Sequence, residues 1–73
     1  MPKLGTFSGE EVCRILASLG FECVRQRGSH VVLQRRIPQG TITVPVPNHR
    51  TLRTGTLLSI IRQSGVDKER FMR

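Results

Sequence analysis

Two tight-turn signals divide residues 21–46 into three short segments, and this division constrains the fold more than any other feature of the chain. The first signal is Arg27-Gly28-Ser29, and the second is Ile37-Pro38-Gln39-Gly40. The segments, residues 21–26, 30–36 and 41–46, have the length of strands, and the last is rich in β-branched residues. Because short turns join antiparallel neighbours, the pattern predicts a three-stranded meander.

Alternation along these strands predicts one covered face and one open face of the sheet. The residues expected to face the core are Val31, Leu33, Ile42, Val44 and Val46. The residues expected on the open face are His30, Val32, Gln34, Arg36, Thr41 and Thr43. The turn before His30 brings Arg25 or Arg27 near it, so the sequence places an imidazole among arginines. Pro45 lacks a donor for the ladder, which predicts that the third strand ends at a sheet edge.

Each end of the chain carries signals for a helix. Ser8 and Glu11 form a capping box, and the apolar residues that follow recur at helical spacing. Gly20 stands where a left-handed residue ends a helix. A second helix is expected over Thr54–Ser64, closed by Gly65, before a short final turn.

The predicted order is therefore helix, three strands, helix and a short helical tail, in one domain that spans residues 1–73. This is an α+β sandwich in which the helices cover one face of an antiparallel sheet. A domain of this length has a thin core. We therefore expect any chemistry to take place at a surface, with few groups.

Basic residues dominate the middle of the chain. The formal net charge is +7, and no Asp or Glu lies between Glu22 and Asp67. Most of the basic residues are arginine, whose guanidinium suits phosphate geometry. A field of this sign attracts polyanions, which favours nucleic acid as a partner. A solvated basic surface that only aids solubility would have the same composition.

The sequence disfavours several other classes of protein. No apolar run approaches the length of a membrane-spanning helix, and the first residues lack the apolar segment of a signal peptide. We therefore expect no membrane association and a cytoplasmic location, with Cys13 and Cys23 reduced. The chain has neither a zinc-ligand spacing nor a carboxylate cluster for Mg²⁺, so we expect no metal and no other cofactor.

Several short motifs follow one another in a fixed order along the chain. The first is Gly28-Ser29-His30 followed by Val31-Val32-Leu33. The second is Ile42-Thr43-Val44-Pro45-Val46, then a polar loop, then Gly55-Thr56-Leu57 and residues 60–65. They are preceded by Ser8-Gly9-Glu10-Glu11 and Leu19-Gly20-Phe21. No single motif is specific, but by the order and spacing of these motifs the chain resembles, over residues 7–72, the HicA toxins of bacterial type II toxin–antitoxin systems.

The resemblance implies a fold like the double-stranded RNA-binding domain and an endoribonuclease that cleaves messenger RNA and arrests translation. It also implies a HicB-type antitoxin that covers the active face, and it assigns the family's catalytic histidine to His30. One departure is Thr54, where the family often has Pro. The start of the second helix lacks the lysine cluster of ordinary double-stranded RNA-binding domains, which favours a single-stranded or locally unpaired target over a duplex.

Cleavage of RNA requires removal of the 2′-hydroxyl proton, stabilisation of charge at phosphorus and protonation of the leaving 5′-oxygen. A neutral His30 could act as the general base. The candidate RNA-binding residues around it are Arg25, Arg27, Ser29, Gln34 and Arg36. The general acid is not evident, because His49, the other histidine, is interpreted as a solvated loop residue.

Two other functions fit the same residues. One is a non-catalytic basic RNA-binding module, in which replacing His30 would leave every activity intact. The other is an interaction protein whose basic face serves an acidic partner, and such a protein would show no salt-dependent affinity for RNA.

Overall fold

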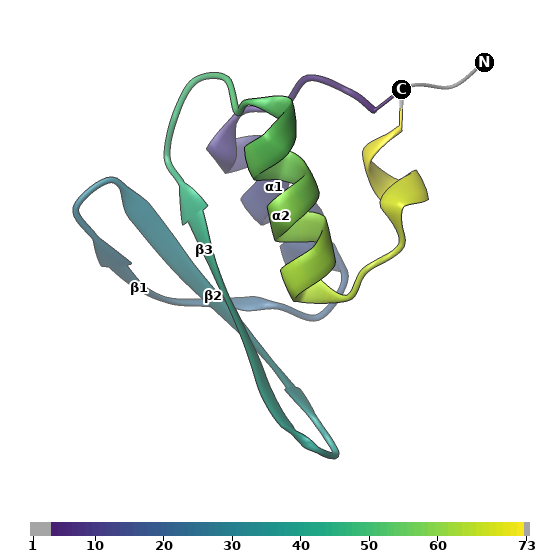
Figure 1. Ribbon diagram of the computed structural model, residues 1–73. Helices are drawn as coiled ribbons and strands as arrows, with labels where there is room; N and C mark the ends of the chain where they lie inside the picture. The colour runs from purple at the N-terminus through teal and green to yellow at the C-terminus, as the bar shows by residue number, and fades with distance from the viewer. Residues whose placement is uncertain (1–3, 73) are drawn as a thin grey trace.

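The computed structural model describes residues 4–72 and has the predicted order of elements (Figure 1). The elements are α1 (Gly9–Ser18), β1 (Glu22–Arg27), β2 (His30–Ile37), β3 (Gly40–Pro47), α2 (Thr54–Ser64) and a 3₁₀-helix, η1 (Lys68–Phe71). The strands form one antiparallel sheet in the order β1-β2-β3. The predicted α+β fold is therefore confirmed, and so is the position of the third strand at a sheet edge.

Both hairpins turn on two residues, Gly28-Ser29 and Pro38-Gln39. Gly28 has a φ of 58°, a value that two-residue hairpin turns favour and that glycine adopts without strain. The turns are tighter than the sequence predicted, because the flanking residues Arg27 and Ile37 belong to the strands. As a result, Arg27 lies directly across the β1–β2 ladder from His30.

The ends of α1 follow the sequence signals. Ser8 Oγ accepts a hydrogen bond from the backbone N–H of Glu11, and Glu11 Oε1 accepts one from the N–H of Ser8, both at 3.0 Å. At the other end, the N–H of Phe21 donates to the carbonyl of Leu16 at 3.0 Å. Gly20 lies between them with a φ of 96°. This reversal directs the chain from the helix straight into β1.

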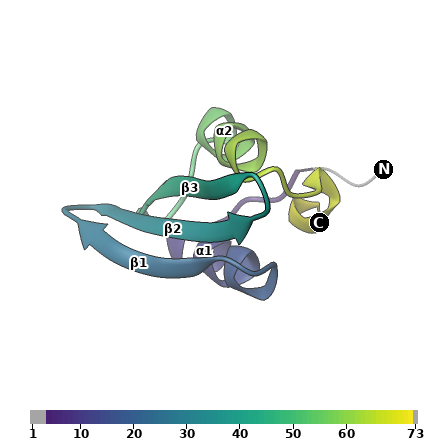
Figure 2. The same ribbon diagram turned by 90° about the horizontal axis from the view of Figure 1, so that it is seen from below.

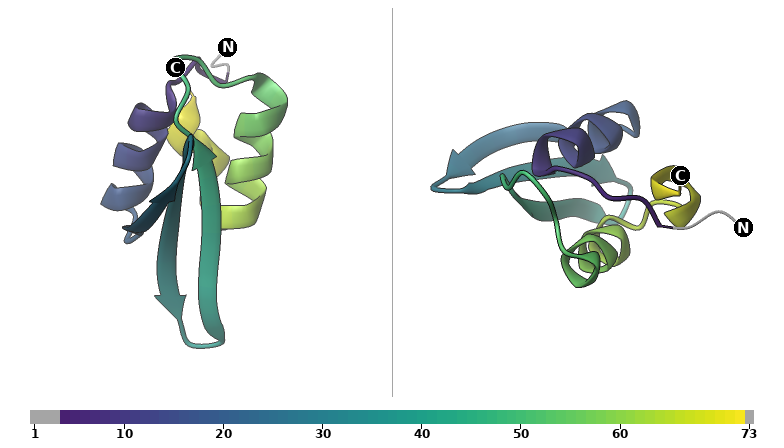
Figure 3. Two further views of the ribbon diagram at one scale, coloured as in Figure 1. Left: turned by 90° about the vertical axis from the view of Figure 1, so that its left-hand side faces the viewer. Right: turned by 90° about the horizontal axis from the view of Figure 1, so that it is seen from above.

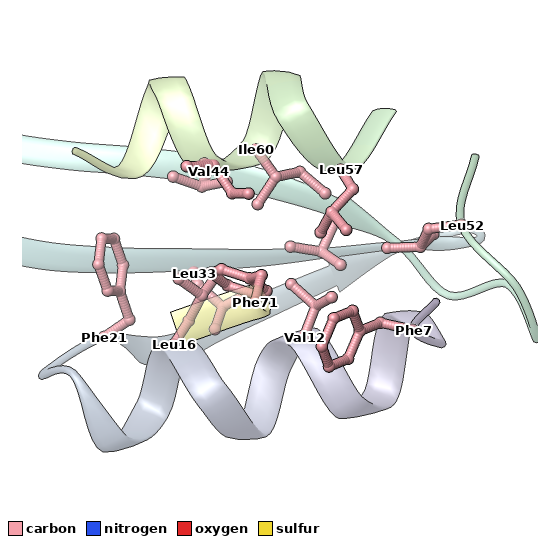
Figure 4. Close-up of a cluster of buried hydrophobic side chains, with 12 residues drawn as sticks. Phe7, Val12, Leu16, Phe21, Leu33, Val44, Leu52, Leu57, Ile60 and Phe71 are labelled. Atoms are coloured by element: carbon pink, nitrogen blue, oxygen red, sulfur yellow. The ribbon is translucent and has the colours of Figure 1, made fainter. Parts of the chain in front are cut away.

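Both helices contribute to one core on one face of the sheet (Figure 4). The core residues from the sheet are Leu33, Val44 and Val46, with Val31 and Ile42 partly buried beside them, as predicted. The helices add Val12, Leu16, Leu57, Ile60 and Ile61. Each large side chain buried in this way stabilises the fold by roughly 1.5–3 kcal/mol. The helix α1 lies on the β1 side of the sheet and α2 on the β3 side (Figure 2 and Figure 3).

Three contacts between segments far apart in the sequence close the structure. Leu52 lies in a loop expected to be polar, but its side chain is buried and its N–H donates to the carbonyl of Phe7 at 2.8 Å. Near the two ends, the N–H of Gly5 donates to the carbonyl of Phe71 at 2.7 Å. The rings of Phe7 and Phe71 meet edge to face at 5.6 Å. These contacts fix the loop after β3 and the C-terminal tail to the start of α1.

Gly9, the first residue of α1, provides a test of this packing. A Cβ added at Gly9 would overlap the carbonyl oxygen of Pro47, and the Gly9 N–H donates to the carbonyl of His49 at 2.9 Å. Because a backbone atom blocks the added methyl group, Gly9→Ala should lower the free energy of unfolding by about 1–3 kcal/mol or more. Urea unfolding followed by circular dichroism measures this change.

The matched control is Gly55, which also lies in the first turn of a helix but has open space where a Cβ would be. Gly55→Ala should leave stability unchanged or raise it by up to about 1 kcal/mol. Equal losses in the two variants would contradict the close approach at Gly9.

Candidate functional site

His30 is the first residue of β2 and is exposed on the face of the sheet opposite the core. Its partners in the two ladders are Arg27 on β1 and Pro47 on β3. Residues that lie directly opposite each other in antiparallel strands point to the same face. Arg27 is therefore the predicted cation that the ladder places directly beside His30.

His30 also lines a groove between the edge strand β3 and α2, which we call the His30 groove. Its volume is about 330 Å³. Besides His30, the residues that line it include Pro45 and Pro47 from β3, and Gly55, Thr56, Ser59 and Gln63 from α2. One wall therefore carries a histidine and two prolines, and the other carries the polar side of a helix. The place of α2 along β3 (Figure 3) is what creates the second wall.

A hydrogen bond within α2 joins two of the polar side chains that line the groove. Gln63 Nε2 donates to Ser59 Oγ at 2.9 Å, one helical turn away. Since this bond uses Ser59 Oγ as an acceptor, the hydroxyl proton of Ser59 is left to donate into the groove. Thr56 lies a further turn toward the start of the helix.

The N-terminus of α2 borders the same groove. The N-cap residue, Arg53, makes no side-chain hydrogen bond to the helix, and Gly55 places no side chain over the first turn. The first N–H groups of a helix have no partner within it, and the helix dipole gives this end partial positive charge. This end of α2 therefore adds a field that favours an anion beside His30.

The other predicted RNA-binding residues are distributed along the open face. The ladders pair Arg25 with Val32, Gln34 with Glu22 and Thr43, and Arg36 with Thr41. Along β2, Gln34 is roughly 13 Å from His30 and Arg36 roughly 20 Å, at about 3.3 Å per residue. The structure thus places Arg27 and Ser29 next to His30 and Arg25 nearby, but it separates Gln34 and Arg36 from them.

Val32 lies between His30 and Gln34 on this face. Although the sequence placed it on the open side, its side chain is only 8% exposed, and it lies outside the main core cluster. Its ladder partners are Arg25 and Pro45. The open face is therefore not uniformly polar, because a covered apolar residue separates the His30 groove from the distal end of β2.

The loop after β3 is fixed to the turn that precedes His30, since the N–H of Asn48 donates to the carbonyl of Ser29. His49 follows in this loop and is exposed. Its carbonyl accepts the bond from Gly9, and its side chain is not among those that line the His30 groove. This position agrees with the interpretation of His49 as a solvated loop residue.

Sequence reasoning missed the contribution of α2 to the groove. Thr56, Ser59 and Gln63 recur at i, i+3 and i+7, beside the apolar stripe of the same helix. This spacing shows that they share one side of the helix. Only the tertiary packing of α2 along β3 shows that this side meets His30.

Among residues 4–72, no group of three His, Cys, Asp or Glu side chains is placed to hold a metal ion. No helix within those residues is long and apolar enough to cross a membrane.

Comparison with known families gives one match. A sequence profile described as "HicA toxin of bacterial toxin-antitoxin" matches residues 9–66. This range includes every residue that lines the His30 groove. A search of curated proteins gave no match.

The two cysteines provide a test of the local environment around α1 and β1. Both are free, Cys13 half-buried and Cys23 exposed. Burial raises the pKa of the Cys13 thiol, and the neighbouring Cys23 and Glu10 raise it further. Because the thiolate is the reactive form, iodoacetamide at pH 8 should alkylate Cys23 before Cys13. Mass spectrometry over a time course, with Cys23→Ser to assign the sites, measures the order, and faster reaction at Cys13 would contradict it.

Proposed function

The chain belongs to the HicA toxin family, and from this premise we propose that it is an endoribonuclease that cleaves messenger RNA and so inhibits translation. Membership of the family makes it a toxin of a toxin–antitoxin system. The observation that supports the nuclease proposal is an exposed histidine in a groove, with an arginine across the strand ladder and a helix N-terminus on the facing wall.

In the proposed reaction, His30 takes the proton from the 2′-hydroxyl of the substrate, whose oxygen attacks the adjacent phosphorus. The bond from phosphorus to the 5′-oxygen breaks, and the leaving oxygen takes a proton from water. The products are a 2′,3′-cyclic phosphate and a free 5′-hydroxyl. A positioned general base typically contributes 10²- to 10⁴-fold to such a rate.

Charge develops on the phosphoryl oxygens as the 2′-oxygen attacks. Arg27 lies across the ladder from His30, and the N-terminus of α2 borders the groove. Both are fixed positive groups, and such groups stabilise a transition state without reorganising during the reaction. In this proposal Thr56 and Ser59 orient the water that protonates the leaving group, and no metal ion or other cofactor is required.

The rest of the open face binds the substrate strand. We assign RNA contacts to Arg25, Arg27, Ser29, Gln34 and Arg36, as the sequence suggested. These residues follow β1 and β2 on the face that carries no helix, which is accessible to an extended single strand. A HicB-type antitoxin that covers this face would block both the groove and the RNA path. The proposed setting is the cytoplasm, where messenger RNA is translated.

Cleavage of a defined RNA tests the role of His30. Purified protein free of antitoxin, in EDTA, should cut the RNA to products with 2′,3′-cyclic phosphate and 5′-hydroxyl ends. His30→Ala should reduce the rate by about 10²- to 10⁴-fold, because the general base is lost. Gel electrophoresis with end-group analysis of the products measures both.

His49→Ala is the matched control, because it removes the other imidazole at an exposed position outside the groove. It should cleave like the wild type. Equal cleavage by His30→Ala would refute the assignment of the base, and loss of cleavage in EDTA would refute metal independence. Binding of RNA without cleavage by any variant would support the non-catalytic RNA-binding module instead.

The salt dependence of binding tests the role of Arg27. In the inactive His30→Ala protein, Arg27→Gln should weaken binding of every single-stranded RNA and lower the slope of log K against log salt by about 0.7, the loss of one phosphate contact. Fluorescence anisotropy at several salt concentrations measures the slope. Arg70→Gln, in η1, makes the same charge change away from the sheet and should leave the slope unchanged.

A further inference from the structure

A second hollow lies away from His30, at the edge of the sheet where β1 begins, and residues of both faces of the sheet line it. β2 and β3 continue beyond the start of β1, because Glu22 at the start of β1 pairs with Gln34 in the middle of β2. The notch left beside the start of β1 has a volume of about 410 Å³, which is within the range of small-ligand sites. The residues that line it include Glu22, Val24, Gln34, Arg35 and Arg36.

Glu22 gives this hollow an unusual character. It is the last acidic residue before a long stretch in which every charged side chain is basic, so it is the only carboxylate on the sheet. Among residues 4–72, its carboxylate has no ion-pair or hydrogen-bond partner, although Arg35 and Arg36 line the same hollow. Both carboxylate oxygens are therefore free to accept hydrogen bonds from a ligand.

Two other polar side chains of the hollow, those of Arg35 and Gln34, contact neighbouring residues. The side chain of Arg35 lies against Gly20, with Nε 3.4 Å from the point where a Cβ would be. Gln34 Nε2 donates to Thr43 Oγ1 at 3.3 Å, which leaves its amide oxygen as a further acceptor. Val24 is 45% exposed and offers an apolar contact at the edge of the hollow.

The carboxylate disfavours a phosphate group at this position, although two arginines line the same hollow. This combination suits a neutral ligand with hydrogen-bond donors on one edge and acceptors on another. Among the RNA bases, guanine has two adjacent donors, N1–H and the N2 amino group, that match the two oxygens of a carboxylate. Its O6 and N7 are the acceptors that arginine binds most often. The other bases offer a single donor group on the corresponding edge.

We propose that the hollow at Glu22 binds a guanine base of the substrate RNA and thereby selects where the chain cuts. Glu22 accepts from N1–H and the amino group, Arg36 or Arg35 donates to O6 and N7, and Val24 contacts the face of the base. The inference rests on the proposed nuclease function, since the same strand would pass from this hollow across Arg25 to His30. The spacing of Gln34 and His30 along β2, roughly 13 Å, sets a fixed offset between the guanine and the cleaved bond.

Binding of short single-stranded RNAs tests the proposal. The protein is the full chain with His30→Ala, to prevent cleavage, and the RNAs contain A and U with one central G, inosine or A. The G-containing RNA should bind about tenfold more tightly than the A-containing one, and inosine, which lacks the amino group, should be intermediate. Adding Glu22→Gln should abolish the preference for G. Fluorescence anisotropy measures each affinity, and circular dichroism confirms that each variant is folded.

Glu69→Gln is the matched control, because it removes the same charge from an exposed position in η1, and it should keep the preference for G. A preference that survives Glu22→Gln would overturn the proposal. An equal gain in affinity for all three RNAs in Glu22→Gln would also overturn the proposal, because Glu22 would then act only as a repulsive charge. Either result would leave His30-dependent cleavage intact. Failure of the wild type to bind or cleave RNA would instead refute the proposed function.

Discussion

The structure depends on the one-sided apolar face of a three-stranded sheet. Leu33 and Val44 lie opposite each other in the β2–β3 ladder and are almost fully buried. A face of this kind is stable only when other elements cover it, and α1 and α2 both contribute to the core on it. Within residues 4–72, neither helix lies over the opposite face (Figure 3). That face is therefore a broad surface on which the proposed substrate can bind.

Most of the fold was predictable because its signals are local. The capping box at Ser8, the reversal at Gly20 and the two-residue turns each depend on residues within one or two turns of chain. The alternation of β2 and β3 then determines the faces, because a slip of one residue would expose the whole core set. The packing of Leu52 and the closure between Gly5 and Phe71 were missed, since each joins segments far apart in the sequence. No local pattern carries that information.

In the candidate site too, the features set by local sequence were predicted and those set by tertiary packing were not. The position of His30 at a strand start, with Arg27 opposite, follows from the turn between them, which the sequence marks with Gly28. The facing wall of the groove comes from α2, whose approach to β3 is set by tertiary packing, so sequence reasoning grouped His30 with Gln34 and Arg36 instead. Gln34 and Arg36 lie on the same face of the sheet as His30, as strand alternation requires. They lie too far along β2 from His30 to line the same groove.

The distribution of charge gives the open face a direction. Positive charge around His30 comes from Arg27 and from the N-terminus of α2, and no carboxylate lines that groove. At the far end of the face, Glu22 lies among arginines. A polyanion that binds along the sheet meets arginines at both ends but a carboxylate at only one of them, so local repulsion of phosphate is confined to the end where Glu22 lies. This asymmetry of surface charge distinguishes the two ends of the sheet for a bound strand.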